Sequence, residues 1–158
     1  MHIPESLDDK SVSTPRVDPM LQAFAAVAER SPLELGVTLN VNGLIITGFI
    51  ISQANYFNAL IEGLGSIESQ NEEVKDSLQT FLKQLKEKLT GSSDSRDGED
   101  NQPLPKFIHL RNVKIYPSEG KGMPTYGEAL WRGKVDAVDG FSLGEMVPAQ
   151  FEGMTPKI

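Results

Sequence analysis

Residues 35–52 constrain the fold more than any other part of the sequence, because two apolar runs flank the dipeptide Asn42-Gly43. Asn-Gly is the strongest short signal for a β-hairpin, since a two-residue type I′ turn needs positive φ at both central positions. This turn fixes the register of the two strands and pairs Leu39 with Ile46. The second strand is apolar on both faces, so we expect both of its faces to be covered.

Helical patterns lie on both sides of this hairpin. Asp18-Pro19 indicates an N-cap followed by proline at the first helical position, and a short helix is expected to begin after Ser52. A longer helix is predicted over residues 67–89. It carries an apolar stripe at alternating spacings of four and three, formed by Val74, Leu78, Phe81 and Leu85. Two interpretations stay open: the stripe packs on the β-structure, or it mediates self-association.

Two further β segments follow an acidic stretch. Residues 90–105 carry four carboxylates and one arginine but almost no large apolar side chain, so they cannot offset their ordering entropy and are predicted to be a disordered linker. Residues 106–116 read as one strand. Residues 130–145 are predicted to form a hairpin whose three-residue Val-Asp-Gly turn pairs Ala137 with Phe141.

These elements predict one α+β domain over residues 18–145, preceded by a disordered lead (1–17) and followed by a loose tail (146–158). A helical insertion, residues 53–89, separates the second strand from the third. We expect a small, strongly bent antiparallel β-barrel of the Sm or SH3 type, with Gly48 at a barrel corner. The alternative is an open antiparallel sheet with helices on one face.

Composition narrows the function classes. The formal net charge is −7 and no basic cluster is present, which argues against nucleic-acid and anionic-membrane partners. The N-terminus lacks a signal peptide, and the longest apolar run falls short of the roughly 20 residues that span a bilayer, so we expect a soluble cytoplasmic protein. With no cysteine and two histidines, the chain lacks the usual zinc-ligand sets, and we predict no metal and no cofactor.

The sequence does not assemble catalytic residues either. It contains no Walker loop and no Gly-x-Ser-x-Gly elbow, and His109 alternates within a predicted strand, which is typical of a structural histidine. Asp136, Asp139 and Glu145 are the only neighbouring carboxylates in the predicted last hairpin, and Asp139 is explained by its place in the turn. We therefore predict that the protein is not an enzyme; a carboxylate enzyme using Asp136 and Glu145 stays a weaker alternative.

Candidate partner contacts come from two places in the sequence. The only tryptophan lies in Trp131-Arg132-Gly133-Lys134. If Trp131 faces the core, Arg132 and Lys134 face solvent; if Trp131 is exposed, it and Arg132 are typical of a binding centre. The candidate contact residues are Trp131, Arg132, Lys134, Phe49, Val74, Leu78, Phe81 and Leu85.

Three separated segments form a combination that is more specific than any of them alone. They are VTLN through YF at residues 37–57, FIHL at 107–110, and WRGK through VDGFSLG at 131–144. Together they resemble the gas vesicle accessory protein GvpU family, over residues 35–62 and 106–144. The resemblance implies a non-enzymatic accessory role in gas vesicles, in which such proteins coat or cluster these buoyant shells. Our hypothesis for the mechanism is that the β-structure binds shell protein in the cytoplasm while the helix at 67–89 mediates self-association, which promotes clustering or assembly of the shells. An Sm-like RNA-binding module and a chaperone for shell subunits stay as alternatives.

Overall fold

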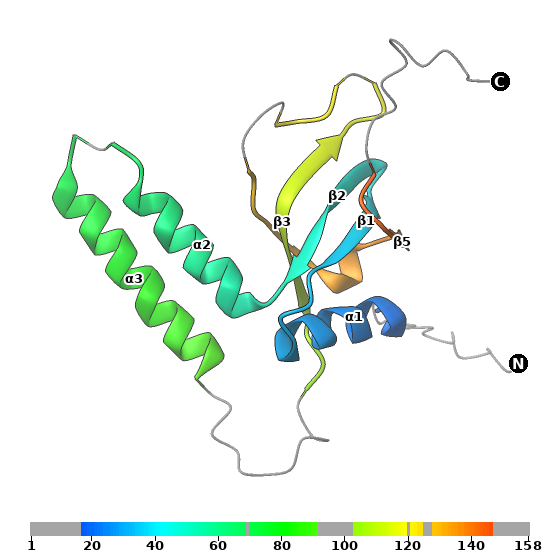
Figure 1. The fold of residues 1–158 in the computed structure, drawn as a ribbon, viewed down its shortest axis with the longest axis horizontal. Coiled ribbons are helices and arrows are strands. Elements are labelled where there is room, and N and C mark those ends of the chain that lie inside the picture. The colour runs from blue at the N-terminus through cyan, green and yellow to red at the C-terminus, as the bar shows by residue number, and fades with distance from the viewer. Residues whose placement is uncertain (1–16, 69, 92–102, 120, 125–127, 147–158) are drawn as a thin grey trace, which may run out of the picture.

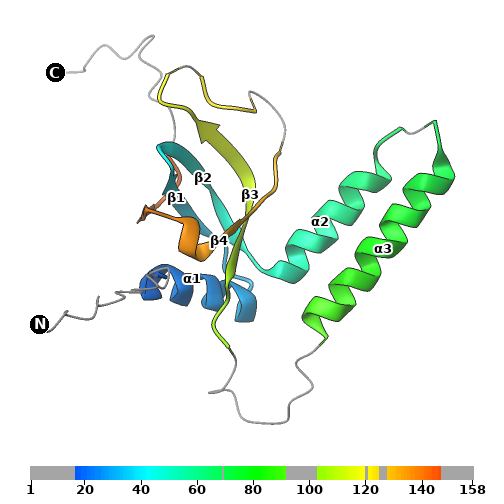
Figure 2. The same ribbon diagram turned by 180° about the vertical axis from the view of Figure 1, so that it is seen from behind.

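The computed structural model describes residues 17–68, 70–91, 103–119, 121–124 and 128–146. Nearly all of the predicted disordered lead, most of the acidic linker and nearly all of the predicted tail lie outside these residues. In chain order, the described elements are α1 (Pro19–Arg30), β1 (Leu35–Val41), β2 (Leu44–Ile51), α2 (Gln53–Gly65), α3 (Glu72–Thr90), β3 (Phe107–Tyr116), β4 (Trp131–Lys134), a 3₁₀ turn η2 (Val135–Ala137) and β5 (Gly140–Leu143). The α+β class and the helical insertion between β2 and β3 are confirmed (Figures 1 and 2).

The β1–β2 hairpin forms in the predicted register. Asn42 and Gly43 have φ values of 51° and 80°, as the type I′ turn requires. Leu39 pairs with Ile46, and the remaining pairs follow from the same turn. The local signal in the sequence was therefore sufficient to place two neighbouring strands.

The sheet holds five antiparallel strands in the order β4-β3-β2-β1-β5. Within the described residues, the edge strands β4 and β5 do not pair with each other, so the sheet is open and the predicted Sm- or SH3-type barrel is not formed. The expected pairing of Ala137 with Phe141 is also wrong. The reason is η2, which buries Val135 and carries the chain across the end of the sheet, so that β5 pairs with β1 instead.

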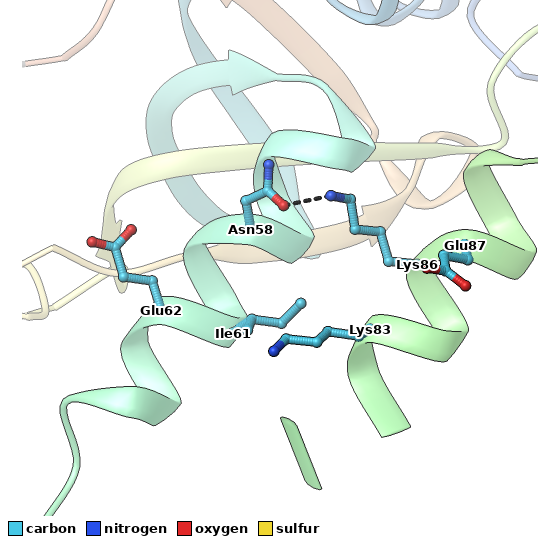
Figure 3. Close-up of a pocket in the computed structure, with 6 residues that line it drawn as sticks. All are labelled: Asn58, Ile61, Glu62, Lys83, Lys86 and Glu87. Atoms are coloured by element: carbon cyan, nitrogen blue, oxygen red, sulfur yellow. Dashed lines mark hydrogen bonds between the residues drawn. The ribbon is translucent and has the colours of Figure 1, made fainter. Parts of the chain in front are cut away.

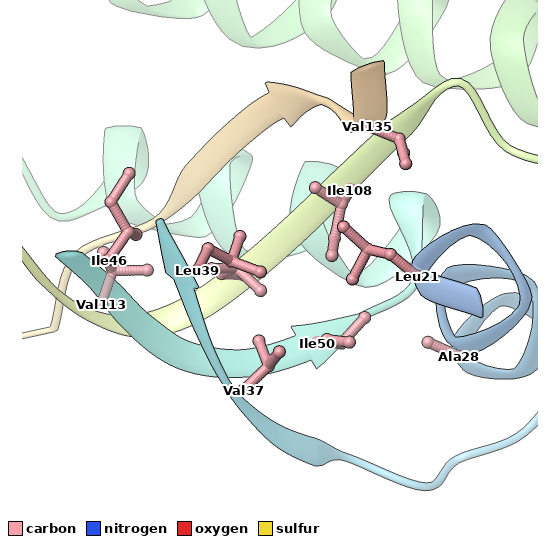
Figure 4. Packing of buried hydrophobic residues seen from close by; sticks show 10 residues of the cluster. Leu21, Ala28, Val37, Leu39, Ile46, Ile50, Ile108, Val113 and Val135 are labelled. Atoms are coloured by element: carbon pink, nitrogen blue, oxygen red, sulfur yellow. The ribbon is translucent and has the colours of Figure 1, made fainter. Parts of the chain in front are cut away.

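The hydrophobic core joins the chain segments on both sides of the acidic linker. Its buried residues come from α1, β1, β2, β3 and η2: Leu21, Ala28, Val37, Leu39, Ile46, Ile50, Ile108, Leu110, Val113 and Val135 (Figure 4). Burying side chains of this size contributes roughly 1.5–3 kcal/mol each, before the entropy of folding is subtracted. The segments before and after the linker therefore share one interior, and none of the residues in this cluster comes from α2 or α3.

Helix α1 covers the core face of the sheet and begins where the sequence predicted. The Asp18 side chain accepts a hydrogen bond from the Met20 backbone N–H, and Pro19 occupies the first helical position. On the opposite face of the sheet, the Tyr56 ring of α2 lies 4.9 Å from the ring of His109 on β3. The helices thus contact both faces of the sheet, unlike the predicted alternative with helices on one face.

Helices α2 and α3 form a hairpin that projects from the sheet, with α3 on its outer side (Figures 1 and 2). The third helix begins at Glu72, later than predicted, because Asn71 acts as its N-cap and accepts a hydrogen bond from the Val74 N–H at 3.2 Å. None of the residues of α3 is buried. The interpretation in which its apolar stripe packs on the β-structure is therefore wrong.

Candidate interaction surfaces

The apolar stripe of α3 is the first candidate surface. Its side chains lie one or two turns apart on one side of the helix, because spacings of three and four residues return to the same face. The exposed fractions are 61% for Val74, 43% for Leu78 and 56% for Phe81, and Leu89 extends the row at 45%. Leu85 is half-buried. The row leaves large apolar side chains in water along the length of the helix.

A different side of α3 attaches it to α2 through polar contacts. Three side chains of α3 donate hydrogen bonds to α2 or to the turn that follows it: Lys75 Nζ to the Ile67 carbonyl (2.8 Å), Gln79 Nε2 to the Ile61 carbonyl (3.1 Å) and Lys86 Nζ to Asn58 Oδ1 (2.6 Å). These residues recur at helical spacing, so they mark one side of α3. The apolar stripe lies about a quarter turn away from that side, given about 3.6 residues per turn, and is left open.

The space between the two helices forms a shallow pocket (Figure 3). It is lined by Asn58, Ile61, Glu62, Lys83, Lys86 and Glu87, and the hydrogen bond between Lys86 and Asn58 crosses it. Every lining residue is exposed or half-buried. Ligand and active sites usually enclose most of a small molecule among apolar walls, and this pocket does not have that form.

The outer face of the sheet is the second candidate surface, and a β-bulge decides which side chains reach it. Arg111 pairs with Phe49 and Lys114 pairs with Thr47, so the register shifts by one residue between these pairs. Asn112, with φ of 51°, is at the shift. Gly48 faces the bulge, and a Cβ there would lie 2.8 Å from the Arg111 carbonyl oxygen.

The bulge gathers positive charge on that outer face. Without it, strand alternation would place Lys114 on the core face. With it, Arg111 and Lys114 share the outer face with Arg132 and Lys134 of β4, which pair with His109 and Phe107. Strands β3 and β4 carry four cations and no carboxylate, in a chain whose net charge is −7.

Two of these cations lie over aromatic rings. The guanidinium carbon of Arg132 is 3.8 Å from the centroid of the Phe107 ring, and that of Arg111 is 5.6 Å from the centroid of Phe49. Cation–π contacts of this kind contribute roughly 0.5–1 kcal/mol at exposed sites and hold the guanidinium in place. Arg111 also forms an ion pair with Glu34, whereas Arg132 is exposed toward solvent.

His109, the partner of Arg132 on the neighbouring strand β3, fixes the position of the Arg132 side chain. Its side chain is 2% exposed, and its Nε2 accepts a hydrogen bond from Arg132 Nε at 3.1 Å. Burial, and secondarily the charge of Arg132, lowers the pKa of His109 from 6.5 to about 4. The imidazole is therefore neutral at pH 7, which leaves Nε2 free to accept. His109 is a positioning residue for Arg132, in keeping with its predicted structural role.

The predicted contact residues fall on different surfaces. Trp131 pairs with Leu110 and packs against the core, so Arg132 and Lys134 face solvent, which is the first of the two arrangements considered. Phe49 is half-buried beneath Arg111. The sequence analysis missed Arg111 and Phe107, because their place on the outer face depends on strand pairing that no local motif reveals.

The carboxylates considered for catalysis lie in different surroundings, and Glu145 is half-buried after the end of β5. Asp136 is exposed on η2, and Asp139 uses its carboxylate to accept the Asn42 backbone N–H at 2.8 Å. Among the described residues, no group of three or more His, Asp or Glu side chains is placed to hold a metal ion. In the same part of the chain, no helix is long and apolar enough to cross a membrane.

Comparison with known proteins identifies the family of this chain. A family model described as "Gas vesicle protein GvpU-like" matches residues 18–146. No curated protein and no solved structure matches the chain. The matched range runs from the N-cap of α1 to three residues beyond β5, and so includes every described element. The chain therefore belongs to the gas vesicle protein GvpU-like family.

Proposed function

We propose that this protein is a non-enzymatic gas vesicle accessory factor that binds shell protein and clusters neighbouring vesicles in the cytoplasm by self-association. The observation that carries the proposal is the exposed stripe of α3, in which Leu78 and Phe81 are 43% and 56% exposed although the core is complete without them. An exposed apolar row that the core does not use is typical of an interaction site. Membership of the family supplies the gas vesicle context.

The outer sheet face is the proposed contact with the shell. Arg132 and Lys134 are exposed there, and Arg132 is held by Phe107 and His109. A side chain that is already ordered loses less entropy when it binds, so a fixed arginine is a favourable anchor. These two cations fit a partner surface that presents carboxylates, whereas Arg111 already pairs with Glu34 and Lys114 Nζ donates to the Pro124 carbonyl.

Co-flotation with purified gas vesicles tests the shell contact. The wild-type protein is expected in the buoyant layer, and the variant R132E/K134E is expected to remain in the liquid below. The matched control is R30E/K88E, which changes the net charge equally at two exposed positions in α1 and α3, outside β3 and β4. Equal flotation of all three proteins would show that this face does not bind the shell.

The clustering role is tested with the variant L78S/F81S, which removes the centre of the stripe. Because these side chains are exposed, the fold should be retained, and the variant should float with vesicles but fail to aggregate them. Light scattering or electron microscopy reports the aggregation. In cells, the variant should leave vesicles dispersed. Loss of vesicles altogether would instead identify a chaperone that acts on shell subunits.

A second candidate function, binding of single-stranded RNA, is favoured by one observation. Phe107 and Phe49 lie beneath arginines on a sheet face, and proteins that bind single-stranded nucleic acid combine cations with aromatic platforms. The net charge of −7 opposes it. Fluorescence anisotropy with single-stranded RNA at increasing salt decides: binding that weakens with salt and is abolished in R132E/K134E supports RNA, and no binding at low salt rejects it.

A further inference from the structure

The stripe of α3 raises the question of which surface covers it. Val74, Leu78 and Phe81 lie about a quarter turn from the side that attaches α3 to α2, and each is more than 40% exposed. Helix α3 is the outer member of the α2–α3 hairpin, on the side of α2 away from the sheet (Figure 1). A partner that approaches this side meets an apolar row that runs from Val74 to Leu89, about 22 Å long at about 1.5 Å per residue.

The sequence of α3 is complementary to itself when reversed about its midpoint, between Gln79 and Thr80. Across that midpoint, the apolar residues of the stripe face each other, Val74 with Leu85 and Leu78 with Phe81. Away from the stripe, acids lie at the same level along the helix axis as bases, Glu73 with Lys86 and Asp76 with Lys83. The exceptions are Glu72 with Glu87, Lys75 with Gln84 and Ser77 with Leu82. In antiparallel coiled coils, the two core positions of one helix face the opposite core positions of the other, which is the pairing that this reversal gives.

The distribution of charge along α3 also favours antiparallel over parallel pairing of two copies of the helix. The first half, residues 72–80, carries three carboxylates and one lysine, and the second half, residues 81–90, carries three lysines and one carboxylate. Antiparallel pairing places the acidic half of one helix beside the basic half of the other and opposes the two helix dipoles. Parallel pairing places like charges side by side. Several of these side chains point away from the stripe, so their charges select orientation more than they add affinity.

We propose that two copies of this chain pair through α3 in an antiparallel arrangement about a two-fold axis that passes between Gln79 and Thr80. The second copy is the occupant, because a helix that is complementary to its own reversed sequence satisfies the isologous contact of a two-fold dimer. A heterologous partner would not require that symmetry. The inference rests on the proposed self-association and adds to it the partner, the orientation and the register.

Disulfide cross-linking tests the register, and the natural chain contains no cysteine that would interfere. The variants V74C and L85C are prepared separately, one of them with a mass tag, and are oxidised alone and after mixing. In the proposed dimer, position 74 faces position 85, whereas the two copies of position 74 lie about 16 Å apart along the axis. A disulfide needs Cα atoms within about 7 Å. Mixed V74C–L85C dimers are therefore expected, with at least about tenfold fewer V74C–V74C dimers.

Sedimentation equilibrium of the full chain measures whether the pairing occurs at all. The wild-type protein is expected to dimerise, and L78S/F81S should raise the dissociation constant at least about a hundredfold, because the two-fold axis uses each replaced side chain twice. Circular dichroism of the wild-type protein and of L78S/F81S checks that the variant stays helical. A dimer that forms V74C–V74C disulfides would be parallel, which overturns the inference but leaves the proposed self-association intact. A chain that stays monomeric overturns both, while co-flotation still reports shell binding separately.

Discussion

Replacing His109 with glutamine is expected to remove a pH-dependent part of the free energy of unfolding. His109 is 2% exposed, and its surroundings disfavour a second positive charge: Arg132 donates to its Nε2, the Tyr56 ring lies 4.9 Å away, and the apolar Ile51 is its partner on β2. Burial and the charge of Arg132 lower its pKa to about 4 in the folded protein. Glutamine keeps an acceptor for Arg132 but does not titrate.

The sign and the size of the effect follow from proton linkage. Between the unfolded pKa of 6.5 and the folded pKa of about 4, the unfolded chain binds a proton that the folded chain does not. The contribution of His109 is therefore fully present above pH 6.5 and is lost as the pH falls toward 4. At about 1.4 kcal/mol per pKa unit, the loss amounts to about 3 kcal/mol. That is a large share of the 5–15 kcal/mol that is typical of a domain.

Urea unfolding at several pH values between 7.5 and 4 measures this contribution. The wild-type protein and H109Q should approach each other in stability as the pH falls, because the difference between them isolates one histidine from the titrating carboxylates. H2Q serves as the matched control, since His2 is the other histidine of the chain, and it should follow the wild-type curve. Parallel curves for the wild-type protein and H109Q would refute the reasoning.

Three further substitutions test the local structure by thermal or urea unfolding. G48A should destabilise the protein by about 1–3 kcal/mol, because the new Cβ would lie 2.8 Å from the Arg111 carbonyl oxygen. G63A should stabilise it by about 0.5–1 kcal/mol, because Gly63 lies within α2 and an added Cβ there meets nothing within 4 Å. D139A should destabilise the protein by about 1 kcal/mol, because the Asn42 N–H loses its acceptor. If one of these variants unfolded like the wild-type protein, the contact that the substitution tests would be wrong.

Local signals in the sequence predicted the parts of the fold that depend on near neighbours. The Asn42-Gly43 turn determines the β1–β2 register, and Asp18 and Ser52 place the starts of α1 and α2 by capping. In each case the interaction spans only a few residues, so its geometry is contained in the sequence pattern. The spacing of the α3 stripe was likewise visible, although its exposure was not.

Long-range contacts determine what the sequence could not predict. The partner of β5 is β1 because η2 buries Val135 and leads the chain to the far edge of the sheet. The outer face acquires Lys114 only through the bulge at Asn112, which needs Gly48 on a strand far away in the sequence. An alternating pattern read along β3 alone assigns Lys114 to the wrong face.

Antiparallel pairing of α3 would combine the two proposed surfaces into a bivalent particle whose binding faces lie at opposite ends. The sheet lies at the C-terminal end of α3, where α2 begins (Figures 1 and 2). Antiparallel pairing therefore places two sheets at opposite ends of the paired helices, whereas parallel pairing would place both at one end. Two opposed binding faces can hold two vesicles together, which neither face achieves alone.

Mixing wild-type protein with R132E/K134E tests this bivalency, because clustering and binding should respond differently. With equal amounts and random exchange of subunits, about a quarter of the dimers keep two intact faces, while about three-quarters keep at least one. Clustering, followed by light scattering, should therefore fall well below the bound fraction that co-flotation measures. If the two signals fell in parallel, clustering would need only one intact face per dimer, and bridging by a two-fold dimer would be wrong.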